Sequence, residues 1–555
     1  MLYAALKLTH DGTIAVADEE KLLFSVELEK IHNYQRHMHF ENLDVIDEVL
    51  EGFQLTIRDI DRWIIDGWEM DPDGETCSCQ NVVAVGNSKI SVNGYCNSIK
   101  GGDEKSRITG SCDKLGEYVS YTHVYDHICS TYCTSQFARE EKSAYILMYD
   151  GGVKPLLFYY DADCARFVFI KELMKLGGDV YTRMAAETEA FAYSRRKRNG
   201  EDTFTQKYAG RIMAYVALGE VRQELMRIFS EEYLKIGEDN SIENGWKQNK
   251  TFVKNVIKRI DNRFCDSDII ASFHFFIQDL LCKELRGYFN ETPKNNGELN
   301  LCLCGGNFLN IKWNAAIRNL GIFSDIYAPP FINDTGVAIG AICAERLSTD
   351  KRPYLKCDTY SGNEIGSNYV EIGWDKRKCS VKELARYISD TKKPIVLLSG
   401  RCELGPRALG NRSIIADARS IQMKQLLNNI KHREQYRPIA PICLEEDAMN
   451  YFIPGSKDKF MLFEHVGTEY GLKAVPAVFH LDNTARLQTV CKEDNWLLYE
   501  LLTEYKAITG ESVLCNTSAN APGRGFFPDV ESAQRWGGAD AIWSEGFLYT
   551  KILNV

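Results

Sequence analysis

This chain of 555 residues contains few prolines and no long apolar run. Its 14 prolines, 45% hydrophobic residues and 26% charged residues are typical of folded domains and exclude a low-complexity tail. No apolar stretch approaches the length that a transmembrane helix needs. The first residues, MLYAALKLTHDG, lack the basic start and long apolar segment of a secretory signal. We therefore expect a cytoplasmic protein that does not contact a membrane.

The sequence also lacks an excess of positive charge and any cysteine spacing typical of zinc sites. Its net charge is −11, which disfavours a nucleic-acid partner because affinity for a phosphate backbone requires many pooled cations. The 18 cysteines are scattered, and the closest pairs are separated by one residue instead of two. We interpret them as reduced structural thiols.

Length and patterning predict an α/β protein of at least two domains. Apolar strands that end in glycine turns alternate with helical segments, whereas residues 348–380 are polar and have little periodicity. We expect a first domain over residues 1–350 with a helical insertion at about 179–290, a linker over 351–379 and a second domain over 380–555.

The most informative stretch is RCELGPRALGNRS at residues 401–413, which places Arg401, Arg407 and Arg412 around two turn glycines. Residues 401–437 contain eight Lys or Arg against three acidic residues, although the whole chain is acidic. Guanidinium groups match phosphate or carboxylate oxygens in pairs, and glycines let backbone N–H groups approach the same oxygens. This pattern favours a site for a phosphorylated small molecule over its alternative, a solvated basic face.

A second set of residues indicates a metal site. His123 and His127 are four residues apart in a predicted helix, so both imidazoles project from one face. Asp150 and Asp334 each follow an apolar segment and offer carboxylate oxygens. Two histidines with carboxylates suit Fe²⁺, Zn²⁺ or Mn²⁺. In the alternative interpretation the histidines are structural and Asp126 pairs with one of them.

Glycine turns after predicted strands suggest the nucleotide cleft of an actin-like fold. They are Asp150-Gly151-Gly152 and Gly305-Gly306, with Asn310 at the end of the second turn and the loop at residues 333–336 following in the same order. His10 and Asp11 end the first predicted strand and are candidates for the general base that deprotonates a hydroxyl. A simple turn role is the alternative for Asp11.

Several motifs together resemble the carbamoyltransferase family, which includes nodulation-factor and antibiotic-tailoring O-carbamoyltransferases. They are, in order, HVYDH, YDGG, AGRIMAY, LCLCGGNFLN, INDTGVAIGA, RCELGPRALGNRSIIADAR, KHREQYRPIAP, HLDNTARLQTV and LCNTSAN. The resemblance covers the chain except its helical middle. It implies an N-terminal actin-like (ASKHA) two-lobed domain that transfers the carbamoyl group and a C-terminal YrdC-like domain that forms carbamoyl adenylate from carbamoyl phosphate and ATP with Mg²⁺.

The resemblance also implies roles for individual residues. Lys431, Arg437 and Arg486 fall where similar enzymes keep catalytic cations, and Arg401, Arg407 and Arg412 would frame the same pocket. Asn516, Ser518 and Asn520 resemble residues that bind the carbamoyl or phosphate groups; capping of the next helix is their alternative role. His123, His127, Asp150 and Asp334 become ligands of a metal, usually iron, and His10 becomes the favoured base.

Two departures from the family pattern are Ala519, where many relatives have an aromatic residue, and Arg524, near a position that is often acidic. The function expected from the resemblance is carbamoyl transfer to a hydroxyl of a small natural product, and a homodimer is compatible with it. The alternatives are a threonylcarbamoyl-type transferase for tRNA, disfavoured by the acidic charge, and a degenerate nucleotide-binding scaffold without turnover.

Overall fold

The computed structural model describes residues 1–68, 81–96, 107–198, 201–204, 208–237, 244–260, 263–291, 298–366 and 369–552. The chain divides into two compact units. Unit 1 comprises Met1–Leu23 and His39–Cys357, and unit 2 comprises Phe24–Met38 and Asp358–Val555.

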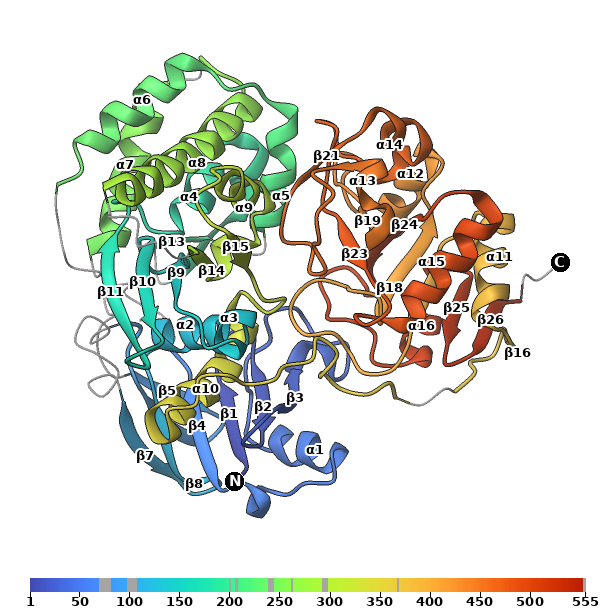
Figure 1. Ribbon diagram of the computed structural model, residues 1–555, viewed down its shortest axis with the longest axis horizontal. Coiled ribbons are helices and arrows are strands. Elements are labelled where there is room, and N and C mark those ends of the chain that lie inside the picture. Colours follow the sequence, from blue (N-terminus) through green and yellow to red (C-terminus); the bar gives the residue numbers. More distant parts are fainter. Residues whose placement is uncertain are drawn as a thin grey trace. The chain divides into compact units, whose positions relative to one another are not determined.

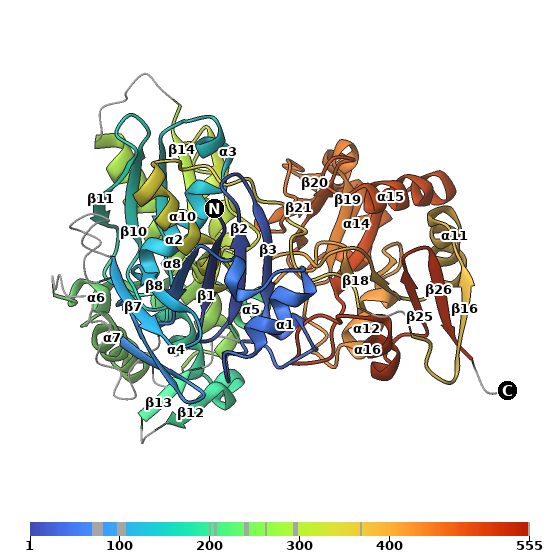
Figure 2. The ribbon, with the colours of Figure 1, turned by 90° about the horizontal axis from the view of Figure 1, so that it is seen from below.

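The first sheet of unit 1 begins with a hairpin whose strands are fully buried, as two apolar stretches joined by the turn His10-Asp11-Gly12 predict. Its strand order is β3-β2-β1-β4-β8-β7, and β1, β2 and β3 lie side by side in both views of the ribbon (Figures 1 and 2). Strand β1 pairs antiparallel with β2 and parallel with β4. The strands are β1 (Tyr3–Lys7), β2 (Thr13–Ala17), β3 (Leu22–Glu27), β4 (Arg62–Asp66), β7 (Ile108–Cys112) and β8 (Gly116–Ser120). The chain passes from unit 1 to unit 2 within β3, because its residues from Phe24 onward are assigned to unit 2.

The second sheet of unit 1, β11-β10-β9-β14-β15, repeats the order of the first four strands. Counted within each sheet, these strands run third, second, first, fourth; the second sheet then ends with its fifth strand, whereas the first sheet ends with its sixth and fifth. Its first strand again pairs antiparallel with the second and parallel with the fourth. The expected α/β class and the two-lobed actin-like architecture are therefore confirmed by topology. The strands are β9 (Ala144–Met148), β10 (Leu156–Asp161), β11 (Arg166–Glu172), β14 (Asn300–Cys304) and β15 (Asp325–Tyr327).

Two buried helices of unit 1 pack unusually closely. A Cβ atom at Gly340 of α10 would lie 1.8 Å from the carbonyl oxygen of Asp126 in α2, so only glycine fits this crossing. The helices are α1 (Val45–Gly52), α2 (His123–Cys133), α3 (Gln136–Arg139), α4 (Val180–Ala186), α5 (Ala209–Tyr215), α6 (Gln223–Leu234), α7 (Asn244–Ile260), α8 (Asp266–Glu291), α9 (Ile311–Arg318) and α10 (Val337–Asp350).

The expected helical insertion corresponds to α4 to α8, with a small hairpin of β12 (Arg195–Arg198) and β13 (Glu201–Phe204). A second small hairpin pairs β5 (Asn81–Val85) with β6 (Ser88–Val92). Within the ranges that the structure describes, no helix is both long and apolar enough to cross a membrane.

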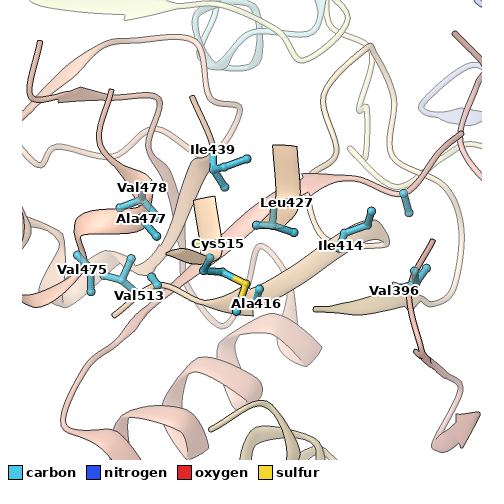
Figure 3. Packing of buried hydrophobic residues seen from close by; sticks show 14 of the residues in the cluster. Val396, Ile414, Ala416, Leu427, Ile439, Val475, Ala477, Val478, Val513 and Cys515 are labelled. Carbon is cyan, nitrogen blue, oxygen red and sulfur yellow. The ribbon is translucent and has the colours of Figure 1, made fainter. Parts of the chain in front are cut away.

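Unit 2 is built on an eight-stranded mixed sheet in the order β16-β26-β25-β17-β18-β24-β19-β23. One face buries Val396, Ile414, Leu427 and Val513 among other apolar side chains (Figure 3), each of which stabilises the fold by about 1.5–3 kcal/mol when fully buried. The strands are β16 (Trp374–Lys378), β17 (Ile395–Leu398), β18 (Arg412–Asp417), β19 (Ala440–Leu444), β23 (Gln488–Val490), β24 (Val513–Ser518), β25 (Ala541–Ser544) and β26 (Phe547–Lys551).

A smaller sheet and six helices complete the described part of unit 2. The sheet has the order β20-β21-β22. Its strands are β20 (Phe452–Ile453), β21 (His465–Gly467) and β22 (Thr484–Ala485), and the helices are α11 (Val381–Thr391), α12 (Ile421–Ile430), α13 (Ala448–Tyr451), α14 (Glu469–Ala474), α15 (Trp496–Thr509) and α16 (Val530–Trp536).

The division of the chain differs from the sequence expectation in two places. Residues from Asp358 onward belong to unit 2, so most of the expected linker over 351–379 is part of that unit. Phe24–Met38 also belongs to unit 2, although the sequence analysis placed it in the first domain. Backbone pairing between residues distant in sequence produces this arrangement, and no local pattern reveals it.

Candidate functional site

Two histidines and two aspartates converge in unit 1. His123 and His127 lie one turn apart on α2, Asp150 follows β9, and Asp334 opens a 3₁₀ turn just before α10. One donor atom from each side chain lies within 4.8 Å of the others, and all four residues are buried. The structure thus brings together the four residues that the sequence analysis expected to bind a metal, and we call them the His/Asp cluster.

The donor atoms of the His/Asp cluster are arranged as a metal site requires. Asp334 Oδ2 lies 3.6 Å from His123 Nε2, and Asp334 Oδ1 lies 3.5 Å from His127 Nε2. His127 Nε2 is buried and makes no hydrogen bond to the residues that the structure describes. A buried polar atom without such a bond is costly. Two imidazoles and two carboxylates therefore fit Fe²⁺, Zn²⁺ or Mn²⁺ as a ligand set.

Asp334 is held in its charged form by its neighbours. Burial would raise the pKa of its carboxyl, but the imidazoles of His10 and His123 outweigh burial and hold that pKa well below its usual range. An anionic carboxylate at this position is the form that a divalent cation requires.

Asp66, at the end of the buried strand β4, contacts His123 of the His/Asp cluster. It was not among the residues predicted from the sequence. Its Oδ2 lies 3.1 Å from His123 Nδ1, and its Oδ1 lies 3.4 Å from Lys7 Nζ. Burial would raise the pKa of Asp66, but His123 and Lys7 together lower it. A carboxylate on Nδ1 fixes the imidazole so that Nε2 faces the cluster. The acidic end of the apolar run RWIID was the available sequence signal.

The alternative in which Asp126 pairs with one of the histidines is wrong. Neither carboxylate oxygen of Asp126 forms a hydrogen bond within the described part of the chain, and the carboxylate partner of His123 is Asp66. Burial, followed by the charge of Asp66, raises the pKa of Asp126 well above its usual range.

Asp150 is also held by two partners. Tyr95 donates a hydrogen bond to Oδ2 at 2.6 Å, and the Gly306 N–H donates to Oδ1 at 2.8 Å. Gly305 has a φ of 95°, and a Cβ atom there would lie 2.5 Å from the carbonyl oxygen of Tyr149. The glycine turn at 305–306 therefore orients a member of the His/Asp cluster, a role that the sequence analysis did not foresee.

The other turn residues predicted for nucleotide binding make local contacts. Gly151 accepts from the N–H of Asp179 at 3.1 Å, and Gly152 donates to Tyr95 Oη at 3.2 Å. Asn310 is the N-cap of α9 and accepts from the N–H groups of Lys312 and Trp313. Their contact with a nucleotide stays a prediction.

His10 lies beside the His/Asp cluster, as its place after the first strand suggested. Its Nε2 is 3.0 Å from Asp334 Oδ2, and about a third of the side chain, 36%, is exposed. Burial acts to lower the pKa of His10, but the Asp334 carboxylate outweighs it and raises that pKa. Asp11 has a φ of 57° and its carbonyl accepts from Thr13 Oγ1, which are features of the turn role that was its alternative.

Two of the arginines in RCELGPRALGNRS donate to backbone carbonyls of unit 2. Arg412 is fully buried and donates to the carbonyl oxygens of Ser399, Gly400, Asn411 and Asn363. Arg401 donates to the carbonyls of Ser361 and Gly362. These contacts hold the loop in shape, and the fully buried Arg412 has a structural role instead of the expected ligand contact. Arg401 is only partly buried, and its ligand contact stays a prediction.

Arg407 instead belongs to a group of cations, the cation cluster, in which the charge of each interacts with that of at least one other; it is defined as Arg407, Lys431, Arg433, Arg437 and Arg486. Burial and the charges of Arg486 and Arg437 lower the pKa of Arg407 well below its usual range. Burial and Arg437 likewise lower the pKa values of Arg433 and Arg486. Arg433 was not among the predicted site residues, although its position in the basic run was visible.

Lys431 connects the cation cluster to the end of β24. Its Nζ donates to the carbonyls of Ser518 and Asn520 at 2.8 and 2.6 Å and to Asn520 Oδ1 at 2.6 Å. Asn516 donates to Ala408 O and to Gln488 Oε1. The alternative that these residues cap the next helix is wrong, because α16 begins at Val530 and Asp529 caps it.

Fold and sites together define a two-unit α/β enzyme with a buried candidate metal site in one unit and a crowded cation site in the other. The chain belongs to the carbamoyltransferase family. The family's carbamoyltransferase N-terminus model matches residues 4–343, and its carbamoyltransferase C-terminus model matches residues 385–550. The sequence-based assignment to this family and to enzymes is therefore confirmed.

The reported relatives cover between 41% and 99% of this chain. Nodulation protein U of Sinorhizobium fredii is 39% identical over 569 residues, which span 99% of this chain and 99% of that protein. The 3'-hydroxymethylcephem-O-carbamoyltransferase of Amycolatopsis lactamdurans is 37% identical over 229 residues, 41% of this chain and 43% of that protein. Among solved structures, full-length HypF in its phosphate- and nucleotide-bound form aligns with a TM-score of 0.31 and 14% identity, over 62% of this chain and 55% of that chain.

Proposed function

We propose that the protein is an ATP-dependent O-carbamoyltransferase with two separate reaction sites. Unit 2 forms carbamoyl adenylate from carbamoyl phosphate and ATP, and unit 1 transfers the carbamoyl group to a hydroxyl of a small acceptor. The observation that carries this proposal is the cation cluster. Burial and the repulsion of neighbouring cations lower the pKa values of Arg407, Lys431, Arg433 and Arg486. An anionic ligand would relieve that repulsion.

The first reaction suits a site of this composition. Water hydrolyses carbamoyl phosphate to carbamate and inorganic phosphate. A carbamate oxygen then attacks the α-phosphorus of ATP and displaces pyrophosphate. Carbamoyl phosphate, carbamate and ATP are all anions, and fixed cations stabilise the charge on the transferring phosphoryl group. Arg407, Arg437 and Arg486 would hold the phosphates, with ATP bound as its Mg²⁺ complex. Lys431 is held against Ser518 and Asn520, which supports a position at the carbamoyl or α-phosphate group.

The second reaction suits the His/Asp cluster and His10. The acceptor hydroxyl attacks the carbamoyl carbon, the bond from that carbon to the AMP oxygen breaks, and a base takes the hydroxyl proton. If Asp334 accepts from His10 Nε2–H at the observed 3.0 Å, Nδ1 keeps the lone pair and can accept the proton. A divalent metal held by His123, His127, Asp150 and Asp334 would supply Lewis acidity toward phosphate and carbonyl oxygens.

The acceptor is a hydroxylated small molecule in this proposal. The cephem O-carbamoyltransferase among the relatives is named for a hydroxymethyl acceptor, which supports an alcohol here. A screen of hydroxylated natural products with labelled carbamoyl phosphate would identify it.

The proposal is tested by following pyrophosphate. Purified protein with ATP, Mg²⁺ and carbamoyl phosphate should release pyrophosphate in the absence of any acceptor, and omission of carbamoyl phosphate should prevent the release. If no pyrophosphate forms with all three present, the protein is a scaffold and the proposed function is wrong. Binding of tRNA that weakens with salt would instead favour the tRNA-modifying alternative.

A further inference from the structure

A short segment from the beginning of the chain is built into unit 2. Phe24–Met38 belongs to that unit, although the rest of the unit starts at Asp358. Lys30 is buried and its Nζ donates to the carbonyls of Glu403 and Gly405 at 2.9 and 2.7 Å and to Glu27 at 2.7 Å. Gly405 returns a hydrogen bond to Glu27 at 2.8 Å. These hydrogen bonds attach the segment to the arginine loop at residues 401–413.

A second attachment joins the segment to the loop after β24. The N–H of Gly525 donates to Tyr34 O at 2.9 Å and the N–H of Arg36 donates to Gly523 O at 3.0 Å, while Gln35 and Arg524 form an antiparallel bridge. A Cβ atom at Gly525 would lie 1.9 Å from the carbonyl oxygen of Glu29. Only glycine therefore permits the segment to lie this close.

This pairing places Arg36 next to the loop that holds Lys431. Asn520, which accepts from Lys431 Nζ, donates through its amide to Arg524 O at 2.7 Å, and Arg524 is the residue bridged to Gln35. Burial is the main cause of the lowered pKa values of Arg407 and Lys431, and the charge of Arg36 contributes to both. Two independent features, backbone pairing and electrostatics, thus connect Arg36 to the cation cluster.

Arg36 has room to contact a ligand. Its Nε lies 3.6 Å from Glu29 Oε1, and 40% of its side chain is exposed. Glu29 is buried and its Oε2 accepts from the N–H of His37 at 2.8 Å, so the carboxylate is fixed while the guanidinium keeps exposed donors. An exposed arginine beside buried cations can meet a phosphate without leaving its own position.

We propose that Arg36 is a further anion-binding residue of unit 2, and that Phe24–Met38 positions it by pairing with Gly523–Gly525. Its ligand is a phosphate group of the nucleotide. This inference rests on the proposed function, since it assumes that unit 2 binds ATP. Arg524, which departs from the family pattern, lies where Phe24–Met38 pairs with the loop after β24.

The test measures ATP binding by titration calorimetry with the full-length protein. Arg36→Gln should weaken ATP binding about tenfold, the size expected for one lost charge-assisted phosphate contact, and should flatten its dependence on salt. Arg36→Lys should recover part of the affinity. Lys473→Gln, which removes an exposed charge elsewhere in unit 2, is the matched control and should bind like the unmodified protein.

Gly525→Ala tests the segment itself, because Arg36 remains while its support is displaced. It should also weaken ATP binding, and combining it with Arg36→Gln should add little further loss, since both act on one contact. Thermal melting of each variant separates lost binding from lost folding. Unmodified protein that binds no ATP would overturn the proposed function; ATP binding that is unchanged in Arg36→Gln would overturn only this inference. Additive losses in the double variant would overturn the positioning role.

Discussion

Asp66 Oδ2 lies 3.1 Å from Nδ1 of His123, and both side chains are buried. The two residues come from different elements, β4 and α2, that meet only in the folded unit. Lys7 Nζ also lies 3.4 Å from Asp66 Oδ1, and His123 and Lys7 together keep the buried carboxylate charged. This contact orients His123 toward the rest of the His/Asp cluster.

Asp66→Asn should lower the affinity for a divalent metal about 10- to 100-fold, the usual effect of losing the carboxylate behind a ligating histidine. The measurement is metal content after dialysis, followed by a Co²⁺ titration read from the visible spectrum, which does not depend on activity. Asp113→Asn, an exposed aspartate of unit 1, is the control. Equal Co²⁺ affinity in both variants would contradict the orienting role of Asp66.

Gly340→Ala should destabilise unit 1 by about 1–3 kcal/mol, because the new methyl group would overlap the Asp126 carbonyl where α10 crosses α2. The same displacement moves Asp334 relative to His123 and His127, so bound metal should fall as well. Gly287→Ala in α8, where nothing lies within 4 Å of the new Cβ, should be neutral or stabilising by up to ~1 kcal/mol. Urea denaturation measures both; equal stability of the two variants would contradict the close packing.

Arg486→Ala should abolish pyrophosphate release, whereas His123→Ala should leave it largely intact and stop carbamoyl transfer. The reason is that Arg486 lies in the cation cluster of unit 2 and His123 in the His/Asp cluster of unit 1. Pyrophosphate release without acceptor and carbamoylated product with acceptor are measured separately. Equal loss of the first reaction in both variants would show that the chemistry is not divided between the units.

ATP binding should weaken as pH rises from neutrality toward the ordinary lysine pKa of about 10.4. Burial, with Arg433 and Arg36, lowers the pKa of Lys431 well below its usual value, so Lys431 loses its charge in a range where an ordinary lysine keeps it, whereas ATP is already ionised at neutral pH. The folding stability of the ligand-free protein should follow the opposite trend and increase with pH. Because the folded-state pKa is below the unfolded one, stability gains from deprotonation as pH rises through the folded pKa toward about 10.4.

The measurement is the shift in melting temperature that ATP causes at each pH. In Lys431→Met the shift should be smaller and should depend less on pH. A shift that is constant across the range in the unmodified protein would contradict a role for Lys431 charge in binding.

Much of the His/Asp cluster was predictable because its signals are local. Helical spacing put His123 and His127 on one face, and the polar turns after apolar segments marked Asp150 and Asp334. Asp66 and Tyr95 were not predicted, since neither belongs to a motif and each reaches the cluster only through the packing of β4 and the loop after β6. For Arg412 the sequence suggested a contact that the structure does not have. The arginine spacing predicted a ligand contact, but the guanidinium is buried and donates to backbone carbonyls instead.

The sequence by itself determined the α/β class, the family, the placement of His123 and His127 on one helix face, and the concentration of cations near residues 401–437. These follow from periodicity, spacing and motif order, which are properties of neighbouring residues. The tertiary structure alone decided which arginines face one another, which carboxylate stands behind His123 and where Phe24–Met38 belongs. Contacts between residues hundreds of positions apart depend on strand pairing and on which side chains are buried, and spacing along the chain does not specify either.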